Sequence, residues 1–222
     1  MKMNKTLIIL SLLLVFCISL GAVSATEDIS VNDIDNNVAT VESSVMNEEI
    51  NAVGDGEILN SSENKDIEQA SSFYRMEYDY QIDKTWEITK SNVVIDGQGH
   101  TIYGNGKQAF NIWGNSVTIK NLNFVNCSAS GDGGAIYFMS WGYSYVINCS
   151  FVNCSASDDG GAIYFSGSGF VENCSFVNCS ASDDAGAINM GSGFVRDCSF
   201  VRCESIYGGA VFFWENSGIV EE

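Results

Sequence analysis

Short hydrophobic runs, broken by glycine, serine, asparagine and aspartate, recur at a nearly fixed spacing from Phe124 onward. The hexapeptide Phe-Val-Asn-Cys-Ser-Ala begins at Phe124, Phe151 and Phe176, and the variant Phe-Val-Arg-Cys-Glu-Ser begins at Phe200. The intervals between these phenylalanines are 27, 25 and 24 residues. A period this short is too small for a self-standing domain, so each copy must bury its apolar side against its neighbours.

Each copy also contains a glycine-rich turn followed by a short apolar run, at residues 134–138, 161–165, 186–190 and 209–213. Runs rich in Val, Ile, Phe and Tyr between such turn residues predict strands, and no helical apolar stripe is maintained. About 24 residues at roughly 3.3 Å each make one coil of three short strands and three turns. The sequence therefore predicts an all-β fold, a parallel β-helix with hydrogen bonds between coils.

Alignment of the copies indicates which side chains face the interior. The phenylalanines that open the copies, Phe124, Phe151, Phe176 and Phe200, are predicted to form one core column. The columns headed by Ile136 and Phe138 are apolar in all four copies, so they are also predicted to face the core.

Cysteine takes the place of an inward leucine in three copies. Leu122 of the first copy corresponds to Cys149, Cys174 and Cys198. This equivalence favours small apolar core fillers. Disulfides between coils remain an alternative, because stacked neighbours lie within bridging range. Zinc or iron-sulfur ligation would need converging thiolates or imidazoles, and His100 is the only histidine, so no metal or other cofactor is expected.

Two polar columns fall at the turns. Asparagine or aspartate tolerates the left-handed conformation of a bend, so a corner ladder is predicted at Asn121, Asn148, Asn173 and Asp197. The second column, Asp132, Asp159 and Asp184, stands three residues before each alanine of the glycine turns. Stacked carboxylates repel unless a cation lies between them, so they are weak calcium candidates. Ordinary turn chemistry is the other explanation.

One aromatic column is predicted to face solvent. Tyr137, Tyr164 and Phe212 alternate with the apolar columns, and Asn189 interrupts them. Aromatic rings on consecutive coils are a candidate contact face for a sugar or a partner. The alternative is that stacking between coils only stabilises the sheet.

The chain is predicted to have three parts. Residues 1–25 resemble an export signal, with Lys2 and Lys5 before an apolar run and small residues at 22–25. Residues 26–72 carry twelve acidic residues against one lysine and no aromatic residue, which predicts a disordered acidic spacer. Residues 73–222 form the predicted β-helix, which stops part-way through a coil and suggests a truncated product.

Charge and hydropathy restrict the partners. A net charge of −18 argues against nucleic acid, whose phosphates require a basic surface. No second long apolar segment follows the signal, so the mature chain is expected to have no membrane span, although a retained signal anchor is an alternative. An extracellular or cell-surface location follows from the signal.

The repeat resembles that of a known superfamily. Phe-x-Asn followed by Gly-Gly-Ala-Ile is similar to the repeats of chlamydial polymorphic membrane proteins and of adhesin-like surface proteins of methanogenic archaea. The segment 92–102 is similar to the opening coils of the archaeal proteins. This resemblance implies the pectate-lyase-like right-handed parallel β-helix. The family usually has asparagine where Cys127, Cys154, Cys179 and Cys203 stand, so the cysteine chemistry is not carried over.

Two classes of function follow from the resemblance and the repeats. The first is a non-catalytic, adhesin-like surface protein that contacts a surface polysaccharide, another cell's surface protein or a copy of itself. The second is a polysaccharide lyase or glycosidase, which the superfamily contains. That chemistry needs a unique acid and base pair. No such pair stands apart from the repeat, so the sequence favours the non-catalytic class.

Overall fold

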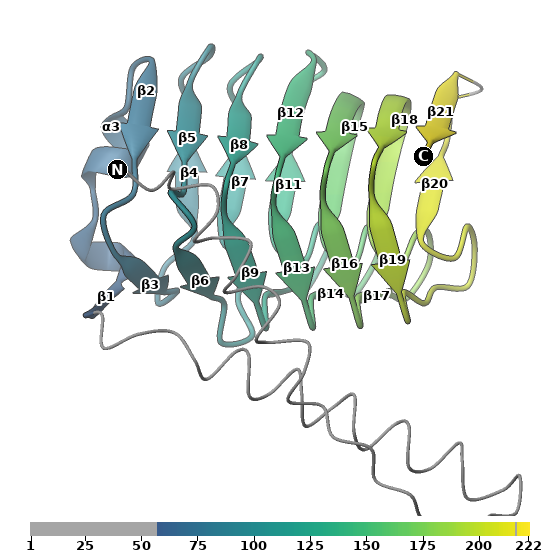
Figure 1. Ribbon diagram of the computed structural model, residues 1–222, viewed down its shortest axis with the longest axis horizontal. Helices are drawn as coiled ribbons and strands as arrows, with labels where there is room; N and C mark the ends of the chain where they lie inside the picture. Colours follow the sequence, from purple (N-terminus) through teal and green to yellow (C-terminus); the bar gives the residue numbers. More distant parts are fainter. Residues whose placement is uncertain (1–56, 216) are drawn as a thin grey trace, which may run out of the picture. The chain divides into compact units, whose positions relative to one another are not determined.

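A computed structural model describes residues 57–215 and 217–222, so the predicted signal and most of the predicted spacer lie outside the described residues. The described chain is a parallel β-helix, as the repeats predicted, and it is right-handed, as the resemblance implied. Its coils stand side by side along the long axis, from β1 at one end to β21 at the other (Figure 1). One sheet contains seven strands, which corresponds to about seven coils.

The strands form three sheets, and all their pairings are parallel. The seven-stranded sheet contains β1 (Ile58–Asn60), β3 (Asp79–Gln81), β6 (Thr101–Tyr103), β9 (Asn123–Val125), β13 (Ser150–Val152), β16 (Ser175–Val177) and β19 (Ser199–Val201). The three-stranded sheet contains β10 (Ser128–Ala129), β14 (Ser155–Ala156) and β17 (Ser180–Ala181).

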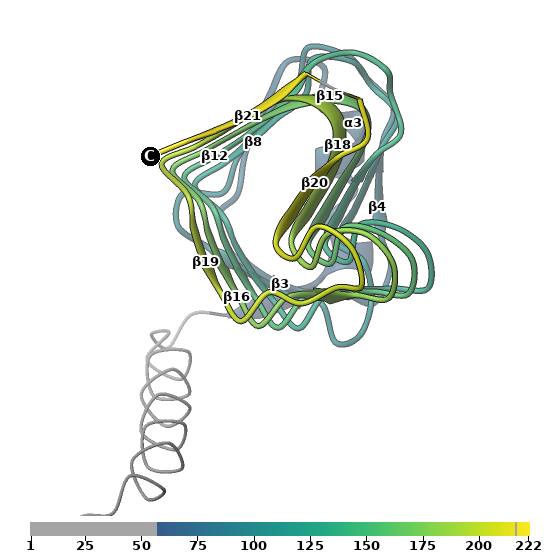
Figure 2. The same cartoon turned by 90° about the vertical axis from the view of Figure 1, so that its right-hand side faces the viewer.

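The third sheet has two arms. The first arm contains β4 (Trp86–Ile88), β7 (Phe110–Ile112), β11 (Ile136–Phe138) and β20 (Val211–Phe213). The second arm contains β2 (Phe73–Arg75), β5 (Val94–Asp96), β8 (Thr118–Lys120), β12 (Ser144–Ile147) and β21 (Gly218–Glu221). The long strands β15 (Ile163–Glu172) and β18 (Ile188–Arg196) run through both arms and bend between them (Figure 2).

The predicted core columns are buried and stacked in register. The rings of Phe124 and Phe151 lie 4.7 Å apart and within 2° of parallel, and Phe151 stacks on Phe176 at 4.8 Å in the same way. Phe200 continues this stack at 5.1 Å and is partly buried. Ile136 and Phe138 are also buried. Identical residues at identical positions therefore build the core as continuous ladders.

The cysteine column is inward where coils cover it on both sides. Cys149 and Cys174 are 4% and 3% exposed, and every cysteine from Cys127 to Cys203 is a free thiol. Cys198 differs from the prediction of a buried core residue, because it is only partly buried. Its neighbouring strand β19 pairs with β16 on one side and with no other described strand, so no further coil covers this thiol.

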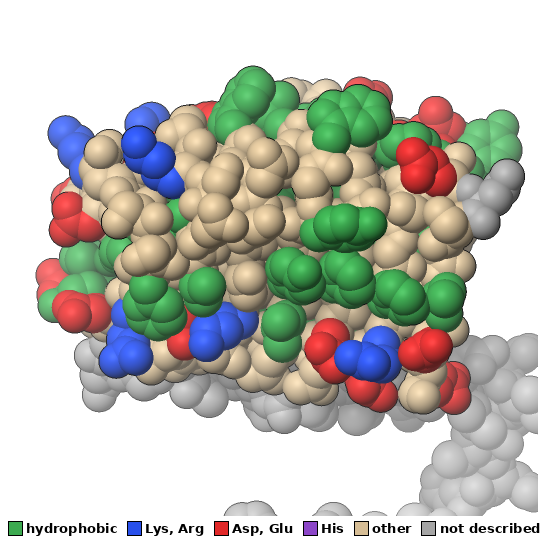
Figure 3. All heavy atoms as spheres, turned by 90° about the horizontal axis from the view of Figure 1, so that it is seen from above, with side chains coloured by type: hydrophobic (Ala, Val, Ile, Leu, Met, Phe, Trp, Pro, Cys, Tyr) green, Lys and Arg blue, Asp and Glu red, His purple; other side chains and the backbone are tan. Residues whose placement is uncertain are grey.

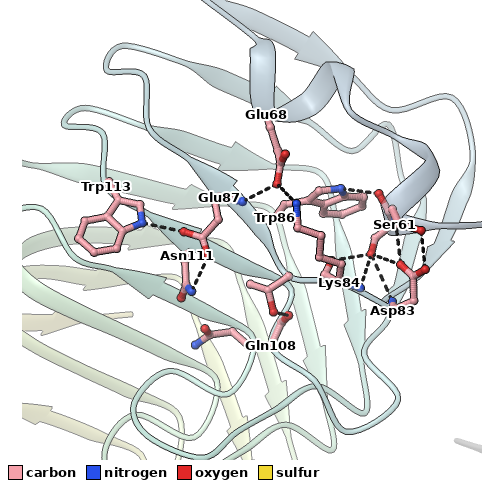
Figure 4. Close-up of polar contacts among 11 residues, drawn as sticks. Ser61, Glu68, Asp83, Lys84, Trp86, Glu87, Gln108, Asn111 and Trp113 are labelled. Atoms are coloured by element: carbon pink, nitrogen blue, oxygen red, sulfur yellow. Dashed lines mark hydrogen bonds and ion pairs between the residues drawn. The ribbon is translucent and has the colours of Figure 1, made fainter.

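The first coil begins earlier than the predicted boundary at Phe73. The segment expected to be spacer contributes β1, the 3-10 turn η1 (Ser61–Glu63) and the short helix α3 (Asp66–Gln69), which stands where the first coil would have a first-arm strand. Ile67 of α3 is completely buried, and the Trp86 indole donates a hydrogen bond to the Ser61 carbonyl at 2.9 Å. Glu68 accepts a hydrogen bond from the backbone of Glu87 at 3.1 Å (Figure 4).

These contacts correct the sequence-based division for residues 57–72. The composition of the segment predicted disorder, but its few apolar and polar side chains are enough to cover the open end of the stack. Neither of the helical segments described in residues 57–222 has the length or apolarity to span a membrane.

Candidate contact face

The outer side of the first arm carries the predicted aromatic column. The strand register places Tyr137 beside Tyr164, Tyr164 beside Asn189, and Asn189 beside Phe212. Tyr137 and Tyr164 meet edge to face, with ring centroids 5.1 Å apart. Both rings are half-buried, as is Phe212. Part of each ring is therefore exposed to solvent, and the rest packs against its neighbours.

Asn189 departs from the outward prediction. Its side chain is only 1% exposed, and its Oδ1 atom has no hydrogen-bond partner. In the sheet it lies between Tyr164 and Phe212, whose larger side chains flank the shorter amide. Asn189 therefore lies on the outward side of its strand, as predicted, but its side chain is too short to reach solvent between the two larger ones.

The same column continues toward the N-terminus in a form that the repeats did not reveal. Asn111 pairs in register with Tyr137 on one side and with Glu87 on the other. The Glu87 carboxylate accepts hydrogen bonds from the Asn111 amide at 3.0 Å and from the indole N–H of Trp113 at 2.7 Å (Figure 4). Trp113 is 53% exposed, so Glu87 holds an indole ring at the surface.

A surface hollow of about 490 Å³ lies at the junction of these residues. It is lined by Trp113, Tyr137, Asn111, Lys107 and Asp132, among others. The loop before β11 overhangs the preceding coil, and Gln108 donates a hydrogen bond to the carbonyl of Asp132 at 2.9 Å. Two aromatic rings, an amide, an ammonium and a carboxylate therefore converge on one depression. The tryptophan lay before the repeats, which is why alignment of the copies missed it.

The predicted acidic column has a structural task in the turns. The backbone N–H of Asp159 donates to the Asp132 carboxylate at 3.3 Å, and the N–H of Asp184 donates to the Asp159 carboxylate at 2.9 Å. Each carboxylate thus joins its coil to the next one. Asp184 pairs with Tyr207, where the column ends. The described residues contain no group of three or more His, Cys, Asp or Glu side chains placed to bind a metal ion.

Burial and mutual repulsion act on these carboxylates together. Burial raises the pKa of Asp132 above its usual value, and the charges of Asp159 and Asp158 raise it further. The hydrogen bond from the Asp159 N–H has the opposite effect and lowers this pKa. The pKa of Asp159 is raised for the same reasons, with Asp183 and Asp158 as neighbours. Burial and the Asp132 charge raise the pKa of Tyr164 to about 12. The charges of the acidic column therefore disfavour ionisation of the Tyr164 hydroxyl in the aromatic column.

The corner ladder has the predicted geometry. Asn121, Asn148, Asn173 and Asp197 all have φ between 51° and 53°. The Asn148 amide donates to Asn121 Oδ1 at 2.7 Å, and the Asn173 amide donates to Asn148 Oδ1 at 3.1 Å. The chain of amides begins at Asp96, which accepts from Asn121 at 2.9 Å.

A second asparagine ladder was not predicted. Asn126, Asn153 and Asn178 have φ between 52° and 54°, and Asn178 donates to Asn153 Oδ1 at 3.2 Å. The signal was present in the sequence, since each of these residues precedes a cysteine of the second column at the same offset.

No family model, curated protein or solved structure matches this chain.

Proposed function

We propose that the protein is an exported, non-catalytic surface protein that binds a polysaccharide along the face that carries Tyr137. The observation that carries this proposal is the hollow between Trp113 and Tyr137. An exposed indole fixed through its N–H offers a flat apolar surface to a sugar ring. The neighbouring amide, ammonium and carboxylate offer partners to its hydroxyl groups.

Charge favours a neutral or amino sugar polymer. The chain carries a net charge of −18, and a polyanion would be repelled at ordinary ionic strength. Only Lys107 contributes a positive charge to the lining of the hollow. The regular spacing of coils suits an extended polymer, because equivalent positions recur about every 4.8 Å along the column.

The test is affinity electrophoresis of the purified protein in gels containing neutral soluble polysaccharides, such as a β-glucan and a galactomannan. Trp113→Ala and the triple variant Tyr137→Ser, Tyr164→Ser, Phe212→Ser are each expected to be retarded less. The dissociation constant for the polysaccharide should rise at least tenfold in each. Ile206→Ser is the matched control, because Ile206 is 70% exposed and does not line the hollow. Retention of binding by both variants, with unchanged circular dichroism, would reject this face as the site.

A polysaccharide lyase or glycosidase remains the second candidate. Asp132 and Asp159 stand in adjacent coils and both have a raised pKa. The coil spacing of about 4.8 Å is close to the carboxylate separation of about 5 to 5.5 Å in retaining glycosidases. Release of reducing or unsaturated ends by the wild type, lost in Asp132→Asn, would favour this candidate. Binding without cleavage would favour the non-catalytic protein.

A further inference from the structure

The outer side of the second arm is a separate surface with two parallel columns. Figure 3 shows it as a band of hydrophobic side chains along the long axis, with a band of acidic and basic side chains beside it. The hydrophobic column runs from Phe73 to Ile219 through Val94, Tyr145, Phe170 and Phe194, and Thr118 interrupts it between Val94 and Tyr145. Phe73, Phe194 and Ile219 are 49%, 39% and 43% exposed.

The rings of this column are stacked on one another. Tyr145 and Phe170 lie 5.1 Å apart at 14°, and Phe170 and Phe194 lie 5.4 Å apart at 15°. Stacked rings cover each other's faces and turn their edges outward, so this column offers little to a sugar that packs on a ring face. The ridge of ring edges from Tyr145 to Phe194 suits a second flat apolar surface instead.

The charged column has an internal symmetry. In coil order its residues are Arg75, Asp96, Lys120, Ile147, Glu172, Arg196 and Glu221. Asp96 is only 5% exposed, whereas the other six are half-buried or exposed. Their charges are plus, minus, plus, zero, minus, plus, minus. The column is neutral on a chain of net charge −18, and reversing its order changes the sign of every charge.

We propose that two copies of this chain associate through their second arms, face to face and end to end reversed, about a two-fold axis that lies between the copies and runs parallel to β12. In that arrangement Arg75 faces Glu221 of the second copy and Lys120 faces its Glu172, while Arg196 of the second copy lies over the ion pair between Lys120 and the largely buried Asp96. Ile147 and Tyr145 meet their own counterparts at the axis. A two-fold interface of this kind is self-complementary.

The intramolecular ion pairs strengthen this match. Lys120 lies 3.1 Å from Asp96, and Arg196 lies 2.7 Å from Glu172. When the second copy is reversed, each pair lies opposite the other pair with opposite charges aligned, which makes two four-charge clusters. A second copy laid in the same direction would be turned about the long axis, which exchanges the two columns and places the charged column against the hydrophobic one. Charges set against apolar rings without a partner disfavour that arrangement.

The size of the face predicts a weak dimer. Six steps of about 4.8 Å give a length of about 29 Å, and two columns give a width of roughly 15 Å. Two copies would bury about 900 Å² in total, which is the size of weak, transient interfaces. This inference does not rest on the proposed polysaccharide binding, because the two faces lie on different arms of the sheet.

Sedimentation equilibrium of the purified full-length chain, from about 1 to about 300 µM, tests the proposal over the range such an interface predicts. The wild type is expected to show a monomer–dimer equilibrium. Lys120→Glu and Glu172→Lys should each weaken it at least tenfold, because each places like charges across the axis. An equimolar mixture of the two variants should recover association to within about threefold of wild type, since the carboxylate introduced in one variant then faces the ammonium introduced in the other.

Lys107→Glu, on another side of the coil, is the matched control and should leave the equilibrium unchanged. All variants carry the same N-terminal segment, so association through that segment would be insensitive to these changes. If either variant melts early by circular dichroism, Arg75→Glu and Glu221→Lys form a second complementary pair with the same expected outcomes. A wild type that stays monomeric, or single variants whose mixture does not recover association, would overturn the proposal.

Discussion

Ala185 has a φ of 57°, the left-handed conformation that Gly160 adopts one coil earlier with a φ of 62°. Left-handed backbone costs a residue with a Cβ roughly 1 to 2 kcal/mol, whereas glycine adopts it freely. Ala185 is completely buried, so this strain is held by the coils on either side. One copy of the repeat thus has alanine at a turn position whose left-handed backbone conformation favours glycine.

Ala185→Gly is expected to stabilise the protein by about 0.5 to 1 kcal/mol, because relief of the strain exceeds the lost methyl contacts and the added chain entropy. The melting temperature should rise by about 1 to 4 °C. Gly160→Ala should lower it, since the reverse change introduces the strain. Equal effects of the two substitutions would contradict the assignment of strain to this turn.

Asn148 joins its neighbours on both sides of the corner ladder. Asn148→Ala should destabilise the fold by about 1 to 3 kcal/mol, because it removes two hydrogen bonds and places alanine at a φ of 53°. Asn148→Gly is the matched control, since it keeps the conformation and loses only the hydrogen bonds. Chemical denaturation should rank wild type above glycine above alanine, and alanine as stable as glycine would show that conformation contributes little.

The repeated columns were predictable because identical residues recur at fixed offsets from the phenylalanines. The Phe124 stack, the Cys149 column and the Asn121 ladder all follow from that alignment. Each of these features also depends on only a few neighbouring residues, since a left-handed corner or an inward side chain is set by the local backbone. Right-handed winding came from the resemblance, because the spacing alone allowed either hand.

Other features depended on contacts that no repeat encodes. The second-arm face joins Tyr145 to Phe170 across a spacing that a loop at 139–143 lengthens by two residues, so their offsets from Phe124 and Phe151 do not match. The N-terminal cap uses an acidic segment whose composition predicted disorder. Asn189 has the expected side of the strand but lies between longer side chains.

The N-terminal cap depends on Ser61, which is 1% exposed. Its hydroxyl donates toward Asp83 and the carbonyl of Lys84, at 2.8 and 2.5 Å, and accepts from the backbone N–H of Lys84 at 3.0 Å. Ser61→Ala should cost about 1 to 3 kcal/mol, because buried backbone groups lose their partner. Ser62→Ala, at an exposed position, is the control and should cost less. Similar losses for both would show that the cap contributes through its surface contacts.

The thiols should react in an order set by burial. A hydrogen bond with the Cys149 thiol and burial raise the pKa of Cys174, against the effect of Cys198, so little thiolate forms. Hydrogen bonds with Cys174 and Cys179, together with burial, also raise the pKa of Cys198 and Cys203. Because these two thiols are only partly buried, a reagent reaches them more easily, so alkylation followed by mass spectrometry should label them before Cys149 and Cys174. Cys174→Ala should cost about 1 to 2 kcal/mol as a small core truncation. Rapid native labelling of Cys174, or a bridge between Cys174 and Cys198 in unreduced protein, would contradict this account.

Two carboxylates should give opposite dependences of stability on pH. Although burial favours its neutral form, hydrogen bonds from Asn121, Lys120 and Gln98 hold the pKa of Asp96 at about 2. A pKa below the unfolded value contributes stability above about pH 4 that is lost as the pH falls toward 2. Asp96→Asn should therefore lower the free energy of unfolding at pH 7 by about 1 to 2 kcal/mol, and this difference should shrink below pH 4.

Asp159 provides the comparison, because burial raises its pKa. A folded-state pKa above the unfolded value means that the charged form opposes folding at neutral pH and that protonation relieves the opposition as the pH falls. Asparagine can still accept the N–H of Asp184 through its side-chain oxygen. Asp159→Asn should therefore raise the melting temperature at pH 7 by about 1 to 3 °C and match the wild type near pH 3. Denaturation curves between pH 2 and 8 measure both variants, and a destabilised Asp159→Asn at pH 7 would show that the carboxylate charge itself strengthens the bond between coils.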